Sequence, residues 1–262
     1  VLFRSHGAGC GWFVLKVLHE TKSPAEIWGH GHMPRSCPVG MDNVVWFLTG
    51  NAGKVEEAAH HFAPLGYEVR QLKEDGGDVV EPQTSDLHAV ALAKIEQAKH
   101  HAPSPSSMLL VEDAGLFIDA LNGFPGVYSS YVYETIGCLG VLRLLSHLQS
   151  EDPVQAKRLR SASFKAVAVM WDGKAVVTGV GACPGSIADE VRGKAGFGYD
   201  PVFIPADLDA AGNACSPGEM GELSTHGKTF GEVDVATKHR FSHRRRALED
   251  LLAQLPNRSE QA

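Results

Sequence analysis

The chain has 262 residues, of which 44% are hydrophobic and 21% are charged, and its formal net charge at pH 7 is -7. This composition is typical of a soluble globular protein with enough apolar material for one large core or two small ones, and the acidity argues against broad binding to nucleic acid backbones. No apolar run approaches the roughly 18 residues that a membrane span needs. The five cysteines are widely spaced without a C-x-x-C pair, so they indicate neither a disulfide framework nor a zinc site. We therefore expect a reducing, cytoplasmic location.

Residues 1–40 are predicted to be an N-terminal extension. They are rich in glycine, histidine and proline, show no convincing signal peptide, and end just before Met41, which precedes the first strongly predicted strand. A transit peptide is the alternative, but Glu20, Glu26 and the scarcity of arginine weigh against it. We expect this segment to be disordered or foreign to the working protein, and we expect residues 41–262 to form the functional domain.

Residues 44–57 read V-V-W-F-L-T-G-N-A-G-K-V-E-E, which predicts a buried strand, a tight glycine turn and the start of a helix. Such a turn directs backbone N–H groups and the positive end of a helix at one point, and Lys54 adds a cation there, so a phosphate is the expected ligand. The turn is not a Walker A loop, because two residues separate Gly50 from Gly53 where that motif has four, and Val55 follows the lysine in place of Ser or Thr. An ordinary strand-to-helix connection is the alternative.

The next segments continue an α/β pattern. Residues 67–72 alternate like a second strand, and a glycine- and acid-rich loop follows over residues 74–78. Apolar residues at helical spacing predict a long helix over residues 86–101.

A short apolar strand over residues 108–113 is predicted to stop at Glu112 and Asp113. Because the carboxyl ends of strands face the ligand crevice in an open α/β sheet, we expect this acid pair beside the glycine turn. Carboxylates in that place would serve as oxygen ligands for magnesium in phosphate chemistry. A solvated strand end is the alternative.

The middle of the chain changes period. Residues 122–130 are rich in turn formers, and residues 135–148 predict an amphipathic helix. Three strand-like segments then predict a hairpin-rich antiparallel region: residues 164–170, 175–180 and 183–187.

The last third carries two further signals. Residues 196–203, G-F-G-Y-D-P-V-F, resemble a base-stacking loop, with core packing under a turn as the alternative. Residues 206–228 are predicted to be a flexible insertion. Residues 238–246 concentrate positive charge at the start of a final helix over residues 247–255, where Lys238, Ser242, His243 and Arg244 are placed to reach an anionic or carbonyl-bearing ligand.

In this order, five motifs resemble those of the inosine triphosphate pyrophosphatase (Ham1-like) family. They are T-G-N-A-G-K at 49–54, V-E-D-A-G-L at 111–116, N-G-F-P-G-V-Y-S at 122–129, G-F-G-Y-D-P-V-F at 196–203, and S-H-R at 242–244 preceded by Lys238. The resemblance covers residues 44–255 and implies an α/β fold: a long, curved mixed β-sheet flanked by helices, with two lobes and a central cleft, usually as a homodimer. The chain departs from the family in Ala114, where bacterial relatives often have Ser, and in a longer stretch over residues 206–230.

The resemblance also implies roles for individual residues. The triphosphate would be held by Thr49, Gly50, Asn51 and Lys54, with Lys238 helping from the other lobe. Glu81 and Asp113 would bind Mg²⁺, and Asp113 would accept the proton of the attacking water, with Glu112 and Lys54 beside it in the catalytic group. Phe197 would stack on the purine, and the residues that would read the base or its sugar are Gly198, Tyr199, Asp200, Ser242, His243 and Arg244.

The activity implied by the resemblance is the Mg²⁺-dependent hydrolysis of non-standard purine nucleoside triphosphates, such as ITP, dITP and XTP, to the monophosphate and pyrophosphate. One alternative is the related septum-inhibition (Maf-like) type of nucleotide pyrophosphatase, which acts on dTTP or UTP, although the G-F-G-Y-D and S-H-R elements argue against it. A module that binds a triphosphate without cleaving it is a second alternative. Nucleic acid binding through residues 244–246 is a third.

Overall fold

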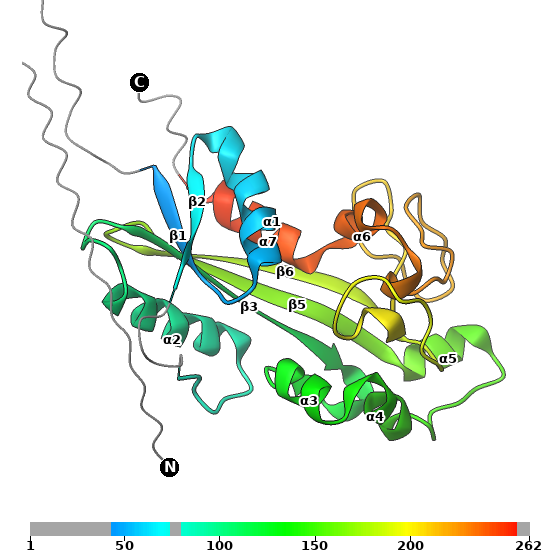
Figure 1. Ribbon diagram of the computed structural model, residues 1–262. Coiled ribbons are helices and arrows are strands. Elements are labelled where there is room, and N and C mark those ends of the chain that lie inside the picture. Colours follow the sequence, from blue (N-terminus) through cyan, green and yellow to red (C-terminus); the bar gives the residue numbers. More distant parts are fainter. Residues whose placement is uncertain (1–42, 74–79, 256–262) are drawn as a thin grey trace, which may run out of the picture. The chain divides into compact units, whose positions relative to one another are not determined.

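The computed structural model describes residues 43–73 and 80–255 (Figure 1), so the extension predicted over residues 1–40 and the loop predicted over residues 74–78 lie outside the described residues. The described part of the chain forms a seven-stranded mixed sheet in the order β2-β1-β3-β5-β6-β7, with β4 pairing β3. The strands are β1 (Val44–Leu48), β2 (Glu68–Leu72), β3 (Met108–Ile118), β4 (Pro125–Gly126), β5 (Ser161–Trp171), β6 (Val176–Ile187) and β7 (Phe203–Pro205). The helices are α1 (Ala52–Phe62), α2 (Leu87–His100), α3 (Ser129–Thr135), α4 (Gly137–Leu144), α5 (Pro153–Leu159), α6 (Val235–Phe241) and α7 (His243–Ala253), with short 3-10 turns at Ala63–Leu65, Asp119–Leu121, Asp200–Val202 and Phe230–Glu232.

The sheet has a parallel end and an antiparallel end. Strand β1 pairs in parallel with β2 and with the first residues of β3, whereas β3, β5, β6 and β7 pair antiparallel. The three long strands β3, β5 and β6 run through both ends. They therefore connect the lobe built on β1 and β2 to the lobe built on β7.

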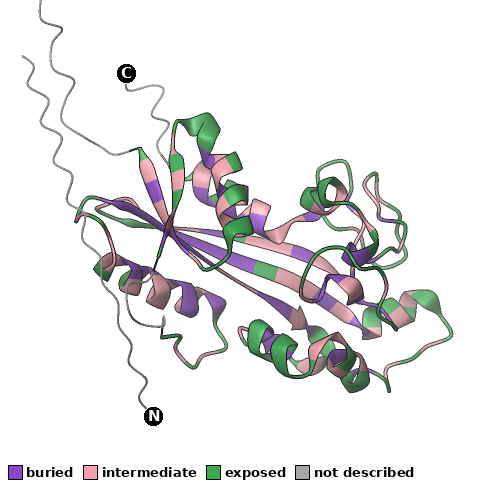
Figure 2. Cartoon of the chain, viewed as in Figure 1, coloured by how far each residue is buried: buried purple, intermediate pink, exposed green. Residues whose placement is uncertain are grey.

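Side chains alternate between the two faces of the sheet, as the period of a strand requires. Helices α1 and α7 cover one face and α2 covers the other (Figure 1). Even-numbered residues of β3, such as Leu110, pack under α1 and α7, and odd-numbered ones, such as Val111, pack under α2. A third cluster, which includes Phe203, Phe230 and Phe241, fills the lobe around β7. Figure 2 shows the resulting buried stripes along the strands and on the sheet-facing side of α2.

Most of the predicted elements are confirmed, but the strand predicted over residues 108–113 is longer than expected. Strand β3 continues through Glu112 and Asp113 to Ile118, because β5 pairs with it beyond the point where β1 ends. Gly115 is compatible with this strand because it allows a close approach: a Cβ there would overlap the carbonyl of Gly126 in β4. The two acids therefore lie within a strand and not at its end.

The helices also differ from the prediction in two places. The helix expected over residues 135–148 is two short helices, α3 and α4, because Gly137 takes a positive φ of 60° that ends one and begins the other. The final helix begins at His243, four residues earlier than expected, and α6 precedes it.

The segment predicted to be a flexible insertion, residues 206–228, is held against the domain. Leu208 is buried and forms β-bridges with Ala214 and Leu223. The Asp207 carboxylate accepts a hydrogen bond of 2.7 Å from the Ser224 hydroxyl. None of the helices in residues 43–73 and 80–255 combines the length and the hydropathy needed to cross a bilayer.

Candidate active site

The turn after β1 has the geometry of a helix N-terminus prepared for an anion. The Asn51 side chain accepts hydrogen bonds from the backbone N–H groups of Gly53 (2.9 Å) and Lys54 (3.4 Å), and the backbone N–H of Asn51 donates to the Thr49 hydroxyl at 3.1 Å. These bonds fix Asn51 as the N-cap of α1. They also direct the positive end of the helix and the Lys54 side chain toward the strand that carries the two acids.

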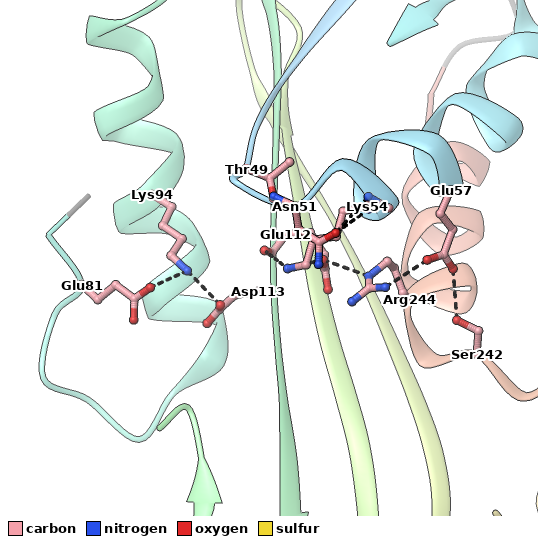
Figure 3. Close-up of polar contacts among 11 residues, drawn as sticks. Thr49, Asn51, Lys54, Glu57, Glu81, Lys94, Glu112, Asp113, Ser242 and Arg244 are labelled. Carbon is pink, nitrogen blue, oxygen red and sulfur yellow. Dashed lines mark hydrogen bonds and ion pairs between the residues drawn. The ribbon is translucent and has the colours of Figure 1, made fainter. Parts of the chain in front are cut away.

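Glu112 and Asp113 are neighbours in sequence but point to opposite faces of the sheet (Figure 3). Glu112 faces α1 and α7, where its partners are Lys54 and Arg244. Asp113 faces α2, where its partner is Lys94. The two carboxylates therefore belong to two different ionic clusters, although the sequence places them side by side.

The Glu112 cluster is buried and connects both ends of the site. The Glu112 Oε2 atom lies 2.7 Å from Lys54 Nζ and 3.1 Å from Arg244 Nε, and the side chain has 0% exposure. Arg244 also contacts Glu57 at 3.0 Å, and Glu57 accepts a hydrogen bond of 3.2 Å from the Ser242 hydroxyl. Burial alone would raise the pKa of Glu112, but Arg244 and Lys54 lower it to about 2, so this carboxylate is ionised at neutral pH.

The second cluster lies on the α2 face and is more open. Lys94 Nζ lies 2.7 Å from Glu81 Oε1 and 2.9 Å from Asp113 Oδ1. Burial raises the pKa of Asp113 and outweighs the opposing effect of Lys94. Because two carboxylates converge on one ammonium group, they are already placed to share a cation. This donor set fits the oxygen ligands that Mg²⁺ takes.

A cleft of about 390 Å³ lies between the glycine turn and the aromatic loop. Its lining combines residues from all five motifs: Asn51, Lys54, Ala114, Gly115, Leu116, Ser129, Ser130, Tyr133, Phe164, Phe197, Gly198, Tyr199, Asp200, Lys238, His243 and Arg244. The structure thus brings most of the predicted substrate-binding residues into one cavity. The predicted site residues that do not line it are Thr49, Gly50, Ser242, Glu81, Glu112 and Asp113.

The aromatic loop presents one ring to the cleft and buries another. Phe197 is 60% exposed, and Lys238 Nζ lies 4.3 Å from its ring centroid. Lys238 also pairs with Asp200 at 2.5 Å, and Asp200 accepts a hydrogen bond of 2.7 Å from the Phe197 N–H. Tyr199 is instead buried, and its hydroxyl donates to the Ser129 carbonyl at 2.9 Å. Phe197 is therefore available for stacking, whereas Tyr199 holds the loop against α3.

His243 enters the cleft as a neutral ring. Its imidazole stacks on Phe164 with ring centroids 5.0 Å apart and an interplanar angle of 13°. Burial, reinforced by Arg244, lowers the pKa of His243 to about 3 despite the opposing effect of Glu112. The buried Nδ1 atom has no hydrogen-bond partner among the described residues. A buried polar atom of this kind is available to a ligand.

Sequence reasoning missed three contributors to the site. Lys94 lies in the helical stripe predicted over residues 86–101, and a lysine among apolar positions was the available signal that it reaches a buried acid. Glu57 lies in the helix after the glycine turn, and no local sequence pattern indicates that it pairs with Arg244. Tyr133 lines the cleft because the predicted helix begins earlier than expected, and its ring meets Tyr199 edge-on at 5.4 Å.

The fold and the cleft define an α/β protein whose ligand site lies between a glycine turn at a helix start and an aromatic loop. A family model described as the Ham1 family matches residues 45–254. The chain belongs to the Ham1 family, which confirms the resemblance carried by the five motifs.

Individual relatives agree with this assignment. A dITP/XTP pyrophosphatase of Thermococcus kodakarensis is 40% identical over 204 residues, which cover 78% of this chain and 92% of the relative. A dITP/XTP pyrophosphatase of Pyrococcus horikoshii is 39% identical over 206 residues, with the same coverage of 78% and 92%. Among solved structures, a HAM1 protein from Coxiella burnetii aligns with a TM-score of 0.61 at 29% identity, over 80% of this chain and 96% of that one.

Replacing Arg244 tests how strongly the buried cluster depends on it. We expect Arg244→Ala to lower the free energy of unfolding by about 3–5 kcal/mol, because the buried Glu112 carboxylate loses one of its two cations. Arg245→Ala is the matched control, because Arg245 pairs with Glu249 on the surface, and we expect it to cost less than about 1 kcal/mol. Chemical denaturation measures both, and equal losses would contradict a buried network centred on Glu112.

The depressed pKa of His243 predicts a loss of stability in mild acid. In the unfolded chain, His243 binds a proton below the ordinary histidine pKa of 6.5, whereas the folded protein resists this until about pH 3. The stability contribution is therefore complete above pH 6.5 and falls as the pH drops, by about 2 kcal/mol at pH 5. We expect His243→Asn to lose less stability than the parent between pH 7 and pH 5 in denaturation experiments. His226→Asn, at an exposed histidine, should follow the parent.

Proposed function

We propose that this chain hydrolyses non-standard purine nucleoside triphosphates, ITP, dITP and XTP among them, to the monophosphate and pyrophosphate. The observation that carries the proposal is the single cleft that joins the glycine turn to the aromatic loop and to His243 and Arg244. A phosphate site at one end and a stacking and base-reading site at the other fit a nucleotide. Two relatives of the chain that are named dITP/XTP pyrophosphatases support this substrate class.

The phosphates would lie at the start of α1, against Lys54, and the purine would stack on Phe197. Lys238 lies over the Phe197 ring in the present arrangement, so a base that stacks on that face would displace the ammonium toward Asp200 and the phosphates. Hydrogen-bond donors from Arg244 and His243 would bind the 6-keto group of hypoxanthine or xanthine. A 6-amino group would leave these donors unpaired, which disfavours adenine.

The two acids would have different roles because their environments move their pKa values apart. Asp113, whose pKa is raised by burial, is suited to accept the proton of an attacking water. Glu112, ionised and fully buried, would hold Lys54 and Arg244 in place and would not exchange protons during turnover. Lys94 would orient Asp113 and counter its charge.

Glu81 and Asp113 would hold Mg²⁺, with Lys94 moving away from between them. A bound magnesium ion supplies charge neutralisation for the phosphates and lowers the pKa of a bound water. The same pair argues against a module that only binds the nucleotide, because Lys94 carries one positive charge for two carboxylates, whereas a divalent cation would balance both.

The competing substrate and ligand classes receive less support. A dTTP- or UTP-specific enzyme is less well supported, because one cleft is lined by Phe197, which would stack on a purine, and by His243 and Arg244, which would read it. For nucleic acid binding, the run 244–246 would need free cations, but Arg244 is buried, Arg245 pairs with Glu249, and Arg246 donates to the carbonyls of Ala182 and Gly212.

We further propose that the protein acts as a homodimer through the outer face of α3 and α4. Tyr131 is 69% exposed and Leu139 is 62% exposed on these helices, and Ile136 and Leu144 extend the same apolar character. Glu134 and Arg143 are the acid and the base of the two helices, and a two-fold arrangement would let them pair across the interface. We place the working protein in the cytoplasm, where Cys138, Cys183 and Cys215, which are free thiols here, would stay reduced.

Pyrophosphate release from ITP, XTP, GTP, ATP and dTTP, with magnesium and with a chelator, tests the activity. We expect fast, magnesium-dependent release from ITP and XTP and slow release from GTP and ATP. Asp113→Asn should lower kcat by at least about 100-fold while nucleotide binding persists. Asp119→Asn, at an exposed acid outside the cleft, is the control and should keep full activity. Preference for dTTP, or full turnover by Asp113→Asn, would overturn the assignment.

The interface proposal has its own test. Leu139→Asp places a charge at an apolar residue of α4 that is 62% exposed, and we expect it to shift the protein to the monomer in sedimentation or light-scattering measurements. Met220→Asp changes an apolar residue that is 85% exposed elsewhere and should leave the oligomeric state unchanged. A parent protein that is monomeric at micromolar concentration would refute this surface as a dimer interface.

A further inference from the structure

Helix α7, which carries His243 and Arg244, packs on one face of the sheet and also covers the open edge of strand β6. Strand β7 pairs only with Gly185, Ser186 and Ile187 at the end of β6. Among the described residues, no strand pairs with the outer edge of the rest of β6. Helix α7 runs along this part of β6 instead (Figure 1). Natural proteins often cover such an edge with a helix, because its unpaired backbone groups would otherwise attract another chain.

Three polar side chains of α7 bind the backbone of this edge in sequence. Gln254 donates to the Thr178 carbonyl at 2.8 Å, and Arg246 donates to the Ala182 carbonyl at 3.2 Å. Between them, the Asp250 carboxylate accepts a hydrogen bond of 2.9 Å from the Val180 N–H. The helix thus offers donors to two carbonyls of the strand edge and an acceptor to the N–H that lies between them.

The spacing of these bonds determines the register of the helix on the strand. Residues four apart in a helix are about 6 Å apart along its axis, and residues two apart in a strand are about 6.6 Å apart. Positions 246, 250 and 254 therefore match positions 182, 180 and 178 one to one. A shift of α7 by one residue would rotate these side chains away from the edge and break all three bonds.

Two glycines of β6 determine how closely α7 approaches the sheet. A Cβ on Gly181 would overlap the carbonyl oxygen of His243 and the amide nitrogen of Ala247, and a Cβ on Gly179 would overlap the same helix one turn further on, at Ala247 and Leu251. Neither glycine has a positive φ, so what each provides is space and not an unusual backbone conformation. The backbone of His243, the first residue of α7, rests directly on Gly181.

We propose that Gly181 and the edge bonds of Arg246, Asp250 and Gln254 are positioning residues that set the depth at which His243 and Arg244 enter the cleft, and so determine base selection. The proposal rests on the proposed function, because the selected ligand is the purine of a triphosphate. Protein interiors are too densely packed to absorb an added methyl group beneath a helix backbone, so α7 must move outward if Gly181 gains a side chain. His243 and Arg244 would move with it, away from the base.

Gly181→Ala and Gly179→Ala form a matched pair for the test. Both add one methyl group under α7, so we expect both to lower thermal stability, but only Gly181 lies under His243. The ratio of kcat/KM for ITP to that for ATP is expected to fall about tenfold or more in Gly181→Ala, mainly through KM for ITP, and to change by less than about twofold in Gly179→Ala. Equal changes in this ratio for the two variants would overturn the proposal.

A second series does not depend on the folding of the glycine variants. Asp250 is exposed and distant from the cleft, so its variants are expected to fold. Asp250→Ala removes the acceptor for the Val180 N–H and should lower the ITP to ATP ratio of kcat/KM, whereas Asp250→Asn keeps an acceptor oxygen and should restore most of it. Failure of Asp250→Asn to exceed Asp250→Ala would contradict a positioning role for the edge bond.

Failure of this inference can be told apart from failure of the proposed function. If the parent protein releases no pyrophosphate from ITP, the proposed function fails, and the same variants are compared by the thermal shift that IMP and AMP produce. In that case a loss of IMP preference in Gly181→Ala alone still supports the positioning role. Retention of the parent preference in every variant overturns it.

Discussion

The buried carboxylate of Glu112 is the interaction on which the rest of the site depends. It joins Lys54, which extends from the start of α1, to Arg244, the second residue of α7, although 132 residues separate Glu112 from Arg244 in the chain. Removed from water, the carboxylate stays ionised because two cations lower its pKa to about 2. Each cation is in turn held in place by the same anion. The glycine-turn end and the α7 end of the cleft are thus positioned by one buried charge.

The alternation of side chains along β3 explains why two adjacent acids can do different work. Glu112 points to the α1 and α7 face, where the cations outweigh burial, and Asp113 points to the α2 face, where burial outweighs Lys94. One lowered and one raised pKa follow from a single strand passing between two helical layers. A pair of acids at a strand end, both open to water, would have shown no such division.

The cleft is assembled by packing contacts outside the motifs as much as by the motifs themselves. Tyr199 anchors the aromatic loop to α3 through the Ser129 carbonyl, and Phe164 in β5 supports the imidazole of His243. Arg246 links α7 both to β6 and to the segment over residues 206–228. The contacts of Asp207 and Leu208 hold this segment together, and none of residues 208–214 lines the cleft.

Local sequence patterns were sufficient to predict the α/β class and several of its elements. These are the strand, turn and helix around residues 44–57, the long helix over residues 86–101 and the β5 and β6 hairpin. They could be predicted because hydrophobic periodicity and turn residues act over short distances. The motifs also identified most of the cleft lining and the Ham1 family. Only the tertiary structure decided that β3 continues past Glu112 and Asp113, that these acids face apart, that Lys94 and Glu57 complete their clusters, and that α7 rests on the edge of β6. The physical reason is that strand length, the pKa of a buried acid and the register of a helix depend on partners brought together from distant parts of the chain, which no local pattern encodes.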